Sequence, residues 1–331
     1  MSLRSLGLEH PWLLTHPVFW TAQHLDLVNC RFQSPDGHGV DSLNCTGIET
    51  GPRDASDHDQ ASVQMAEIFA KSLALRHKTC ALVNLLEYNG SPLEKAKDPP
   101  AFVFAKRPID SSDCTVFHIA KHSTAEQHQD ALPIIGYLDY QTIISKRRQK
   151  LTPRPHPRKG YNGPVQRLYR RKLSKITPRT WCQDPYLACI LLSMAQSLAR
   201  KSYFTQPGVY VVRSPVCLLN SAHLPKTRLL VTIKSDPAFV HLFEAEITPK
   251  LLDILDDPAI NMKHISWPII RHSKLAFQPY CSLQGRLIAR LVGAQESLHM
   301  GTTNFNGANI VSKKRKLVEE NDFARRVRLK G

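Results

Sequence analysis

The sequence predicts an α+β protein whose helices and short antiparallel strands form two lobes, joined by a basic, proline-rich connector and followed by a flexible C-terminal tail. Three observations predict this organisation. Apolar residues recur with helical period near residues 63–73 and 186–201. Short runs rich in β-branched residues are bounded by turn residues. A cluster of prolines and cations separates the two halves. We therefore expect an N-terminal α+β region at 1–140, a connector at 141–180, a C-terminal α+β domain at 181–295 and a tail at 296–331.

The N-terminal region begins with apolar runs and turn-rich stretches. Trp12 and Trp20 can anchor the first runs, whereas residues 34–60 are polar and turn-rich, so we expect a loop or disorder there. From Gln60 a helical stripe begins, and a second apolar run at 80–88 follows it, which predicts either a helical hairpin or one long broken helix.

Three short runs in the N-terminal region predict strands, at 101–105, 115–119 and 134–138. The first two can pair as a hairpin across the turn at 108–113. The stretch that follows, 146–179, contains Pro153, Pro155 and Pro157 with further Gly and Pro residues. Because this spacing interrupts helical hydrogen bonding, it predicts an extended, solvated connector and a domain boundary.

The C-terminal domain contains the best-specified element of the chain. Asp184 can cap a helix at 186–201, with Pro185 in its first turn. Strands are expected at 229–233 and 239–247, then a helix that opens at Thr248 and ends at Asp256. A third strand is expected at 265–272, on a sheet edge because of Pro268; a final helix is expected to be capped by Ser282 and to stop at Gly293.

The segment Asp184–Gln196, followed by Leu229–Thr232, Glu244–Ile247 and Leu251–Asp253, resembles an uncharacterised family of ascomycete fungal proteins. The resemblance covers about residues 181–292. It implies a fungal source and no known activity.

Composition places the protein inside the cell. An apolar fraction of 42% in 331 residues is enough to fill a core. No secretory signal is expected, because Glu9, His10 and Pro11 interrupt the first apolar run. The longest apolar stretch, 186–199, is shorter than the roughly 20 residues that a bilayer requires, so we expect a buried helix and no membrane partner. The eight cysteines are scattered without a C-x-x-C pair, which is typical of thiols kept reduced.

Two polybasic segments carry the whole formal net charge of +16. Residues 146–179 hold 13 basic and no acidic residues, and residues 312–331 hold 8 basic and 3 acidic ones. The remaining chain has 44 − 13 − 8 = 23 basic and 28 − 3 = 25 acidic residues, a sum of −2. This asymmetry indicates an anionic partner and a cellular address, and it identifies no chemistry.

The C-terminal cluster matches the pattern that a nuclear import receptor holds in extended form. The alternative is a solvated tail that only raises solubility. The candidate import residues are Lys313, Lys314, Arg315 and Lys316, with Arg325, Arg326 and Arg328 in a second cluster. We therefore predict a nuclear protein with an import receptor as a partner.

The connector interleaves cations with tyrosines, so phosphates can pair with the cations while a phenol ring stacks on a base. The alternatives are a flexible linker, a second import signal or a site for an acidic partner. The candidate contact residues are Arg147, Arg148, Arg158, Lys159, Tyr161, Arg167, Tyr169, Arg170, Arg171 and Lys172. Because an extended connector offers no rigid element to a groove, we expect binding to DNA or RNA without sequence specificity.

Two further groups of residues resemble a metal site and an acidic active site. Cys114, His118, His122 and His128 approach metal-ligand spacing, but chance clustering among 15 histidines explains them, and no metal is expected. Glu244 and Glu246 share one side of an expected strand, near Asp236, Asp253, Asp256 and Asp257; a polar sheet face explains them without an active site. No catalytic motif and no cofactor-binding loop is present.

The sequence favours a nuclear, non-enzymatic accessory or regulatory protein that contacts nucleic acid or an acidic partner. One alternative is an enzyme or accessory protein of a fungal specialised-metabolite pathway, with a pocket in the C-terminal domain. Another is a pure protein-interaction module.

Overall fold

The computed structural model describes residues 1–34, 57–88, 90–119, 133–154, 162–204 and 226–292, and at 57–59 and 201–204 it describes the backbone alone. Most of the predicted loop at 34–60 and the whole predicted tail at 296–331 lie outside these residues. The described chain is α+β, as predicted.

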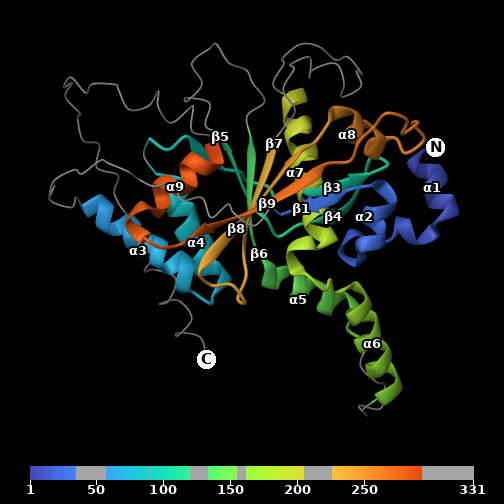
Figure 1. The fold of residues 1–331 in the computed structure, drawn as a ribbon, viewed down its shortest axis with the longest axis horizontal. Helices are drawn as coiled ribbons and strands as arrows, with labels where there is room; N and C mark the ends of the chain where they lie inside the picture. Colours follow the sequence, from blue (N-terminus) through green and yellow to red (C-terminus); the bar gives the residue numbers. More distant parts are fainter. Residues whose placement is uncertain (35–56, 89, 120–132, 155–161, 205–225, 293–331) are drawn as a thin grey trace, which may run out of the picture. The chain divides into compact units, whose positions relative to one another are not determined.

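A seven-stranded mixed sheet forms the centre of the fold (Figure 1). In spatial order its strands are β1 (Arg31–Gln33), β9 (Ile269–Ala276), β8 (Phe239–Glu246), β7 (Lys226–Thr232), β6 (Ile134–Asp139), β5 (Thr115–Ile119) and β2 (Leu93–Lys95). The pairs β1–β9 and β6–β7 are parallel, whereas the prediction had only antiparallel strands; the other four neighbours in this sheet pair antiparallel. A separate antiparallel hairpin joins β3 (Ala101–Phe104) to β4 (Arg107–Ser111).

Helices α3 (Asp57–Lys71), α4 (Leu75–Leu86) and α9 (Tyr280–Val292) cover one face of the sheet (Figure 1). Phe69 of α3 packs edge-to-face on Tyr137 and Phe277, with ring centroids 5.4 and 5.3 Å apart. Of the two predicted arrangements, the helical hairpin is the one that α3 and α4 form. Leu73, which the predicted stripe placed inside, lies in the turn between them and is 86% exposed.

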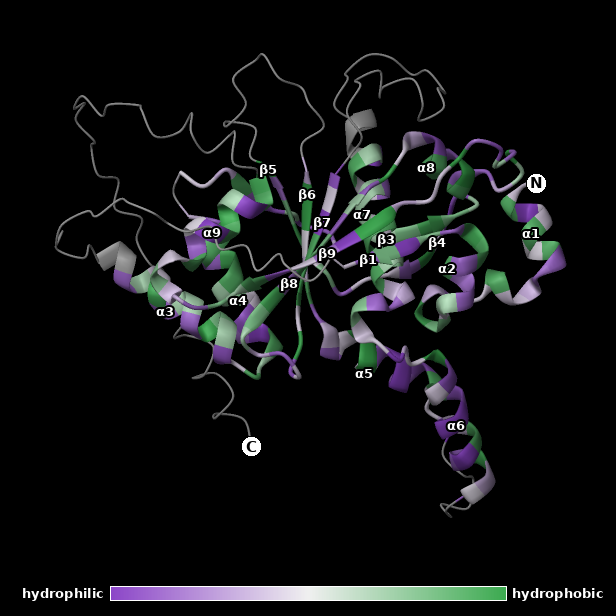
Figure 2. Ribbon diagram, in the orientation of Figure 1, coloured by the Kyte–Doolittle hydropathy of each residue, from purple (hydrophilic) through white to green (hydrophobic). Residues whose placement is uncertain are grey.

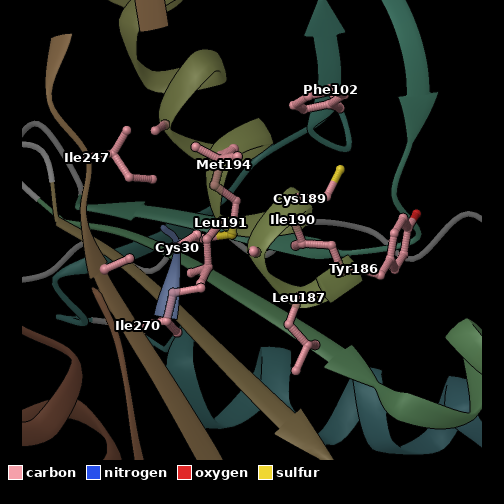
Figure 3. Close-up of a cluster of buried hydrophobic side chains, with 14 of the residues drawn as sticks. Cys30, Phe102, Tyr186, Leu187, Cys189, Ile190, Leu191, Met194, Ile247 and Ile270 are labelled. Atoms are coloured by element: carbon pink, nitrogen blue, oxygen red, sulfur yellow. The ribbon is translucent and has the colours of Figure 1, made fainter. Parts of the chain in front are cut away.

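The opposite face carries α7 (Pro185–Phe204), α8 (Pro249–Asp256), α1 (Leu3–Glu9), α2 (Ala22–Val28) and the 3-10 turns η1 (Pro11–Leu14) and η2 (Pro17–Phe19). Figure 3 shows Leu187, Ile190, Leu191 and Met194 of α7 within this core. Alternation along β6 serves both faces, because Ile134 and Leu138 pack toward α7 while Ile135 and Tyr137 pack toward α3. No helix in the described part of the chain is long and apolar enough to cross a bilayer.

Capping residues fix the starts of α7 and α8 as the sequence predicts. The carboxylate of Asp184 accepts from the backbone N–H of Tyr186 at 2.9 Å and so caps α7. Thr248 Oγ1 accepts from Leu251 N at 3.3 Å, with Pro249 in the first turn of α8. In α9 the predicted cap is wrong: the helix begins at Tyr280, and Ser282 Oγ donates to the carbonyl of Pro279 instead. The predicted stop, Gly293, lies outside the described residues.

The stretch predicted as an extended connector contains two helices, α5 (Tyr140–Leu151) and α6 (Gly163–Ile176). The prolines that suggested extension lie between the helices, except Pro164. Pro164 occupies the first turn of α6, where a missing N–H and a fixed φ favour the helix. The extended conformation predicted for 146–179 is therefore wrong over most of this segment.

Strands of both predicted lobes lie in one sheet. Ile134–Asp139 of β6 pairs in parallel register with Thr227–Thr232 of β7, and residues 1–293 form one compact unit. The described chain therefore differs from a pair of lobes divided at 141–180. The cause is long-range parallel pairing, which leaves no local sequence signal.

Two predicted strand positions also differ. The run at 101–105 pairs with β4, not with β5, because a turn with Ala105 and Lys106 at positive φ closes a tighter hairpin. The strand predicted at a sheet edge is β9, which lies between β1 and β8. Pro268 precedes its first residue, Ile269, and so leaves the ladder of hydrogen bonds intact.

Candidate nucleic-acid interface

The helix α5 is fixed at its start by a buried polar cluster at the end of β6. Asp139 accepts from the backbone N–H of Gln141 at 2.9 Å and from Lys78 Nζ at 2.9 Å, and Thr232 Oγ1 donates to it at 3.0 Å. The residues of α5 that point to the core are Tyr140, Ile143 and Arg147. Anchoring this face leaves the opposite face of α5 in solvent.

Arg147, a predicted contact residue, is buried and structural. Its guanidinium makes a bidentate pair with Asp184, at 2.6 and 2.7 Å, and its Nε donates to the carbonyl of Val18 at 3.0 Å. Tyr140 completes the cluster by donating to Asp184 at 2.7 Å. With 2% exposure Arg147 is inaccessible to a phosphate, so its assignment to the interface is wrong. Sequence reasoning missed its partner because Asp184 lies 37 residues away.

Lys146 is likewise committed to the protein. Its ammonium contacts Asp110 Oδ1 at 2.7 Å, the carbonyl of Ser111 at 2.6 Å and the hydroxyl of Tyr186 at 2.7 Å. Burial raises the pKa of the Tyr186 hydroxyl, which therefore stays protonated and donates to Asp110 at 2.5 Å. All three protons of the ammonium have an acceptor, so Lys146 holds α5 to β4 and α7.

The helix α6 is amphipathic and makes little contact with the rest of the protein. Asn162 caps it by accepting from the N–H of Val165 at 3.3 Å. Val165, Tyr169, Leu173 and Ile176 recur at helical spacing and are half-buried, and no residue of α6 is fully buried. The helix packs mainly against α5 and extends from it (Figure 1), and Figure 2 shows hydrophilic segments alternating with hydrophobic ones along its ribbon.

The exposed cations of α5, α6 and their flanking turns form what we call the cationic surface. Its members are Arg148, Lys150, Arg154, Arg167, Arg170, Arg171, Lys172, Lys175 and Arg179, all of them exposed. Within the described residues, none of their side chains forms an ion pair or a hydrogen bond. The sequence between Asp139 and Asp184 contains no carboxylate that could neutralise them locally.

Of the ten predicted contact residues, the structure brings Arg148, Arg167, Arg170, Arg171 and Lys172 onto this surface. Tyr169 lies on the half-buried side of α6 and is not part of the cationic surface. The remaining three, Arg158, Lys159 and Tyr161, and the import residues at 313–316 and 325–328, lie outside the described residues.

The expectation that the connector offers no rigid element to a groove of nucleic acid is wrong, because α6 is a helix. On α6, Arg167, Arg170, Arg171 and Lys175 lie at spacings of three and four residues and therefore share one face. The signal was present in the sequence: Asn162-Gly163-Pro164 is a helix start, and 13 residues free of Gly and Pro follow.

The alternative site at Glu244 and Glu246 is a cross-strand ion-pair ladder. Glu244 contacts Arg228 Nε at 2.9 Å and Arg290 at 3.6 Å, and Glu246 contacts Lys226 at 3.9 Å. A cavity of about 350 Å³ adjoins both carboxylates. Its lining excludes the predicted neighbours Asp236, Asp253, Asp256 and Asp257. The carboxylates are thus matched by cations of β7 and α9 and do not converge with other acids.

The predicted metal constellation is not assembled in the described part of the chain, where no group of three or more candidate ligands gathers. Cys114 is buried just before β5 and His118 lies on β5. His122 and His128 lie outside the described residues.

One buried pair escaped sequence reasoning entirely. His241 Nδ1 and His272 Nε2 lie 2.9 Å apart on neighbouring strands, with Trp181 edge-on to His241 at 4.6 Å. Burial, with the neighbouring imidazole second, lowers the pKa of His241 to about 4; burial followed by Lys274 lowers that of His272 to about 4. Cross-strand register created this pair, and no spacing along the chain could reveal it.

Comparison of the chain with protein-family models, curated proteins and solved structures finds no match.

Proposed function

We propose that the protein binds nucleic acid by pairing its cationic surface with phosphates, and that it acts as a nuclear accessory or regulatory protein. The observation that supports binding is a set of nine exposed cations on two consecutive helices and their flanking turns, none of them paired with a carboxylate of the described residues. Like charges held this close repel one another, and an approaching polyanion removes that repulsion while releasing counterions.

The shape of α6 favours nucleic acid over a compact acidic protein. An α-helix fits the major groove of a duplex, and cations on more than half of the circumference of α6 can reach the phosphates on both sides. Five of the eight exposed residues of α6 are Arg or Lys, which contact phosphates of any sequence. We therefore expect weak sequence preference and steep dependence on salt.

Titration of the intact protein into labelled duplex and single-stranded oligonucleotides of unrelated sequence tests this proposal. We expect similar affinities for the unrelated sequences and a loss of affinity as salt rises. A polyglutamate peptide of matched charge serves as the control ligand. Tighter binding to polyglutamate than to either nucleic acid would identify an acidic protein as the partner, and absence of binding at low salt would exclude both.

The nuclear address rests on the tail. A reporter fused to residues 312–331 should enter the nucleus, and replacing Lys313, Lys314, Arg315 and Lys316 with Ala should greatly reduce entry, because receptor grooves require consecutive cations. The same replacement in the intact protein, alone and combined with Arg148→Ala and Lys150→Ala, separates the tail from a second signal in α5. Undiminished entry of the fused reporter after the replacement would exclude the tail.

A further inference from the structure

An apolar pocket lies between the N-terminal helices and the β3–β4 hairpin, on the side of the protein formed by α1, α2 and α8. Its volume is about 200 Å³. Buried side chains from five elements enclose it, including Leu3, Trp20, Leu25, Phe102, Leu255 and Trp267. At the rim, Leu14 and Ile109 are 57% and 40% exposed, so the pocket is open to solvent.

Two of the polar side chains that border the pocket, Trp20 and His24, are hydrogen-bonded within the protein. The indole N–H of Trp20 donates to the carbonyl of Thr15 at 3.3 Å. His24 uses both ring nitrogens, one accepting from Thr21 N at 3.0 Å and the other 3.1 Å from the carbonyl of Trp12. Burial lowers the pKa of His24, so its ring is neutral at physiological pH. Among the residues that the structure describes, no Lys, Arg, Asp or Glu lines the pocket.

The size of the pocket limits its occupant. An apolar cavity of about 150 Å³ excludes water and binds benzene, because water gains no hydrogen bonds there. A pocket of about 200 Å³ lined by two indoles and two phenyl rings accommodates one ring with a few additional carbons. The side chain of a partner protein has comparable size, but burial on most sides by separate elements favours a small molecule that enters alone.

Because the pocket is enclosed on most sides and its described lining is apolar and uncharged, we propose that it binds a small, uncharged, predominantly apolar molecule about the size of one substituted six-membered ring. Binding removes the exposed rim side chains Leu14 and Ile109 from water and fills the space between Trp20 and Trp267. An anionic analogue is excluded because its charge would lose hydration without meeting a cation. This inference is independent of the cationic surface.

Toluene, indole and benzoate are suitable probes for the full-length protein. Tryptophan fluorescence reports toluene and benzoate binding, since Trp20 and Trp267 line the pocket, and the shift in melting temperature reports all three. We expect saturable binding of toluene and indole, and benzoate binding at least tenfold weaker than toluene binding. Absence of saturation with both neutral probes would overturn the proposal, and so would benzoate binding as tight as toluene.

Two substitutions locate the binding site. Val28→Phe places a larger side chain in the pocket and should weaken toluene binding at least tenfold, whereas Val83→Phe on α4, outside the pocket, should leave binding unchanged. Leu14→Lys puts a cation at the exposed rim and should reverse the preference toward benzoate without unfolding the protein. Leu8→Lys adds the same charge at a 76% exposed site that does not line the pocket, and should preserve the preference.

The two substitutions also make the test robust against misfolding. If Val28→Phe fails to fold, Leu14→Lys decides alone, because Leu14 is mostly exposed. Unchanged toluene and benzoate affinities in folded Leu14→Lys would place the binding elsewhere and overturn the assignment. Binding only of a peptide that carries an apolar side chain, with no small probe bound, would overturn the small-molecule assignment in favour of a partner protein.

Discussion

Arg147 and Arg148 are neighbours with opposite environments. Arg147 is buried in a bidentate pair with Asp184, whereas Arg148 is exposed on the cationic surface. One-residue steps on a helix turn a side chain by about 100°, which is enough to move it from core to solvent. A cluster of charges in the sequence therefore does not show which cations are buried in the structure and which are exposed for binding.

Replacing Arg147 with Met should lower the free energy of unfolding by about 3–5 kcal/mol, because Asp184 would remain buried without its partner. Arg148→Met, one residue further, should change it by less than about 0.5 kcal/mol and should weaken nucleic-acid binding instead. Urea denaturation of the two variants measures the difference. Equal stabilities would contradict the structural role of Arg147.

Gly136 in β6 is required by close packing. A Cβ at this position would lie 2.7 Å from Met194 Sδ, 2.8 Å from Cys114 Sγ and 3.0 Å from Leu229 Cδ1. Gly136→Ala should therefore destabilise the protein by about 1–3 kcal/mol. Gly285→Ala on α9, where nothing lies within 4 Å of the new Cβ, should stabilise it by about 0.5–1 kcal/mol. Melting temperatures that shift in the same direction would contradict this packing.

At the scale of elements, the prediction found α7 and missed α6. The Asp184-Pro185 start and a continuous apolar run specify α7 locally, so the helix could be predicted without knowledge of its tertiary contacts. In α6 the local start at Asn162 was outweighed by prolines that lie before the helix. For β9, the adjacent Pro268 wrongly suggested an edge, because a proline outside the ladder removes no hydrogen bond.

The strand pair β8–β9 should make stability depend on pH. His241 and His272 have pKa values of about 4 in the folded protein and about 6.5 when unfolded. Between these values the unfolded chain binds more protons, so stability is full above pH 6.5 and falls as the pH approaches 4. We expect a loss of about 2–4 kcal/mol from the pair over this window, opposed by the nearby carboxylate of Asp236.

Denaturation of variants between pH 7 and pH 4 isolates this contribution. His272→Gln retains a hydrogen-bonding group beside His241 and should flatten the pH profile. His77→Gln, at an exposed position of α4, should leave the profile as steep as in the unsubstituted protein. A His272→Gln profile as steep as the control would exclude the pair as the cause.

At the scale of the whole molecule, one sheet joins the two halves of the described chain. β6 and β7 are adjacent and parallel although 86 residues separate Asp139 from Lys226, counted along the sequence. The elements were largely predictable because each depends on local patterning. Their assembly was not, since parallel pairing and the buried pairs Arg147–Asp184 and Lys78–Asp139 join distant residues.

Neither half should fold alone. A fragment of residues 1–154 exposes the β6 edge and lacks α7, and a fragment of residues 162–293 lacks the strands that neighbour β7 and β9. We expect poor dispersion in the amide NMR spectrum of each fragment, and recovery of dispersion when the two are mixed or coexpressed, because the sheet core requires both. A well-dispersed spectrum from either fragment alone would restore the division into independent lobes.

The positive charge of the candidate interface could be predicted from the sequence. The faces that its helices expose could not. The absence of carboxylates between Asp139 and Asp184 is visible in the sequence. The structure retains this property, because the residues of the cationic surface have no acidic neighbour along the chain. The burial of Arg147 and Lys146, and the half-buried position of Tyr169, depend on which face of α5 or α6 meets the protein. Those orientations follow from packing, so the sequence could not assign them.

Binding through α6 is tested most directly by the salt dependence of duplex binding by the Arg170→Ala, Arg171→Ala, Lys172→Ala triple variant. If each residue contacts one phosphate, the slope of log affinity against log salt should become shallower by about three units, equally for unrelated sequences. A control that replaces the exposed Lys95, Lys97 and Lys263 with Ala removes the same charge elsewhere and should keep the original slope. Equal slopes for the two variants would contradict binding through α6.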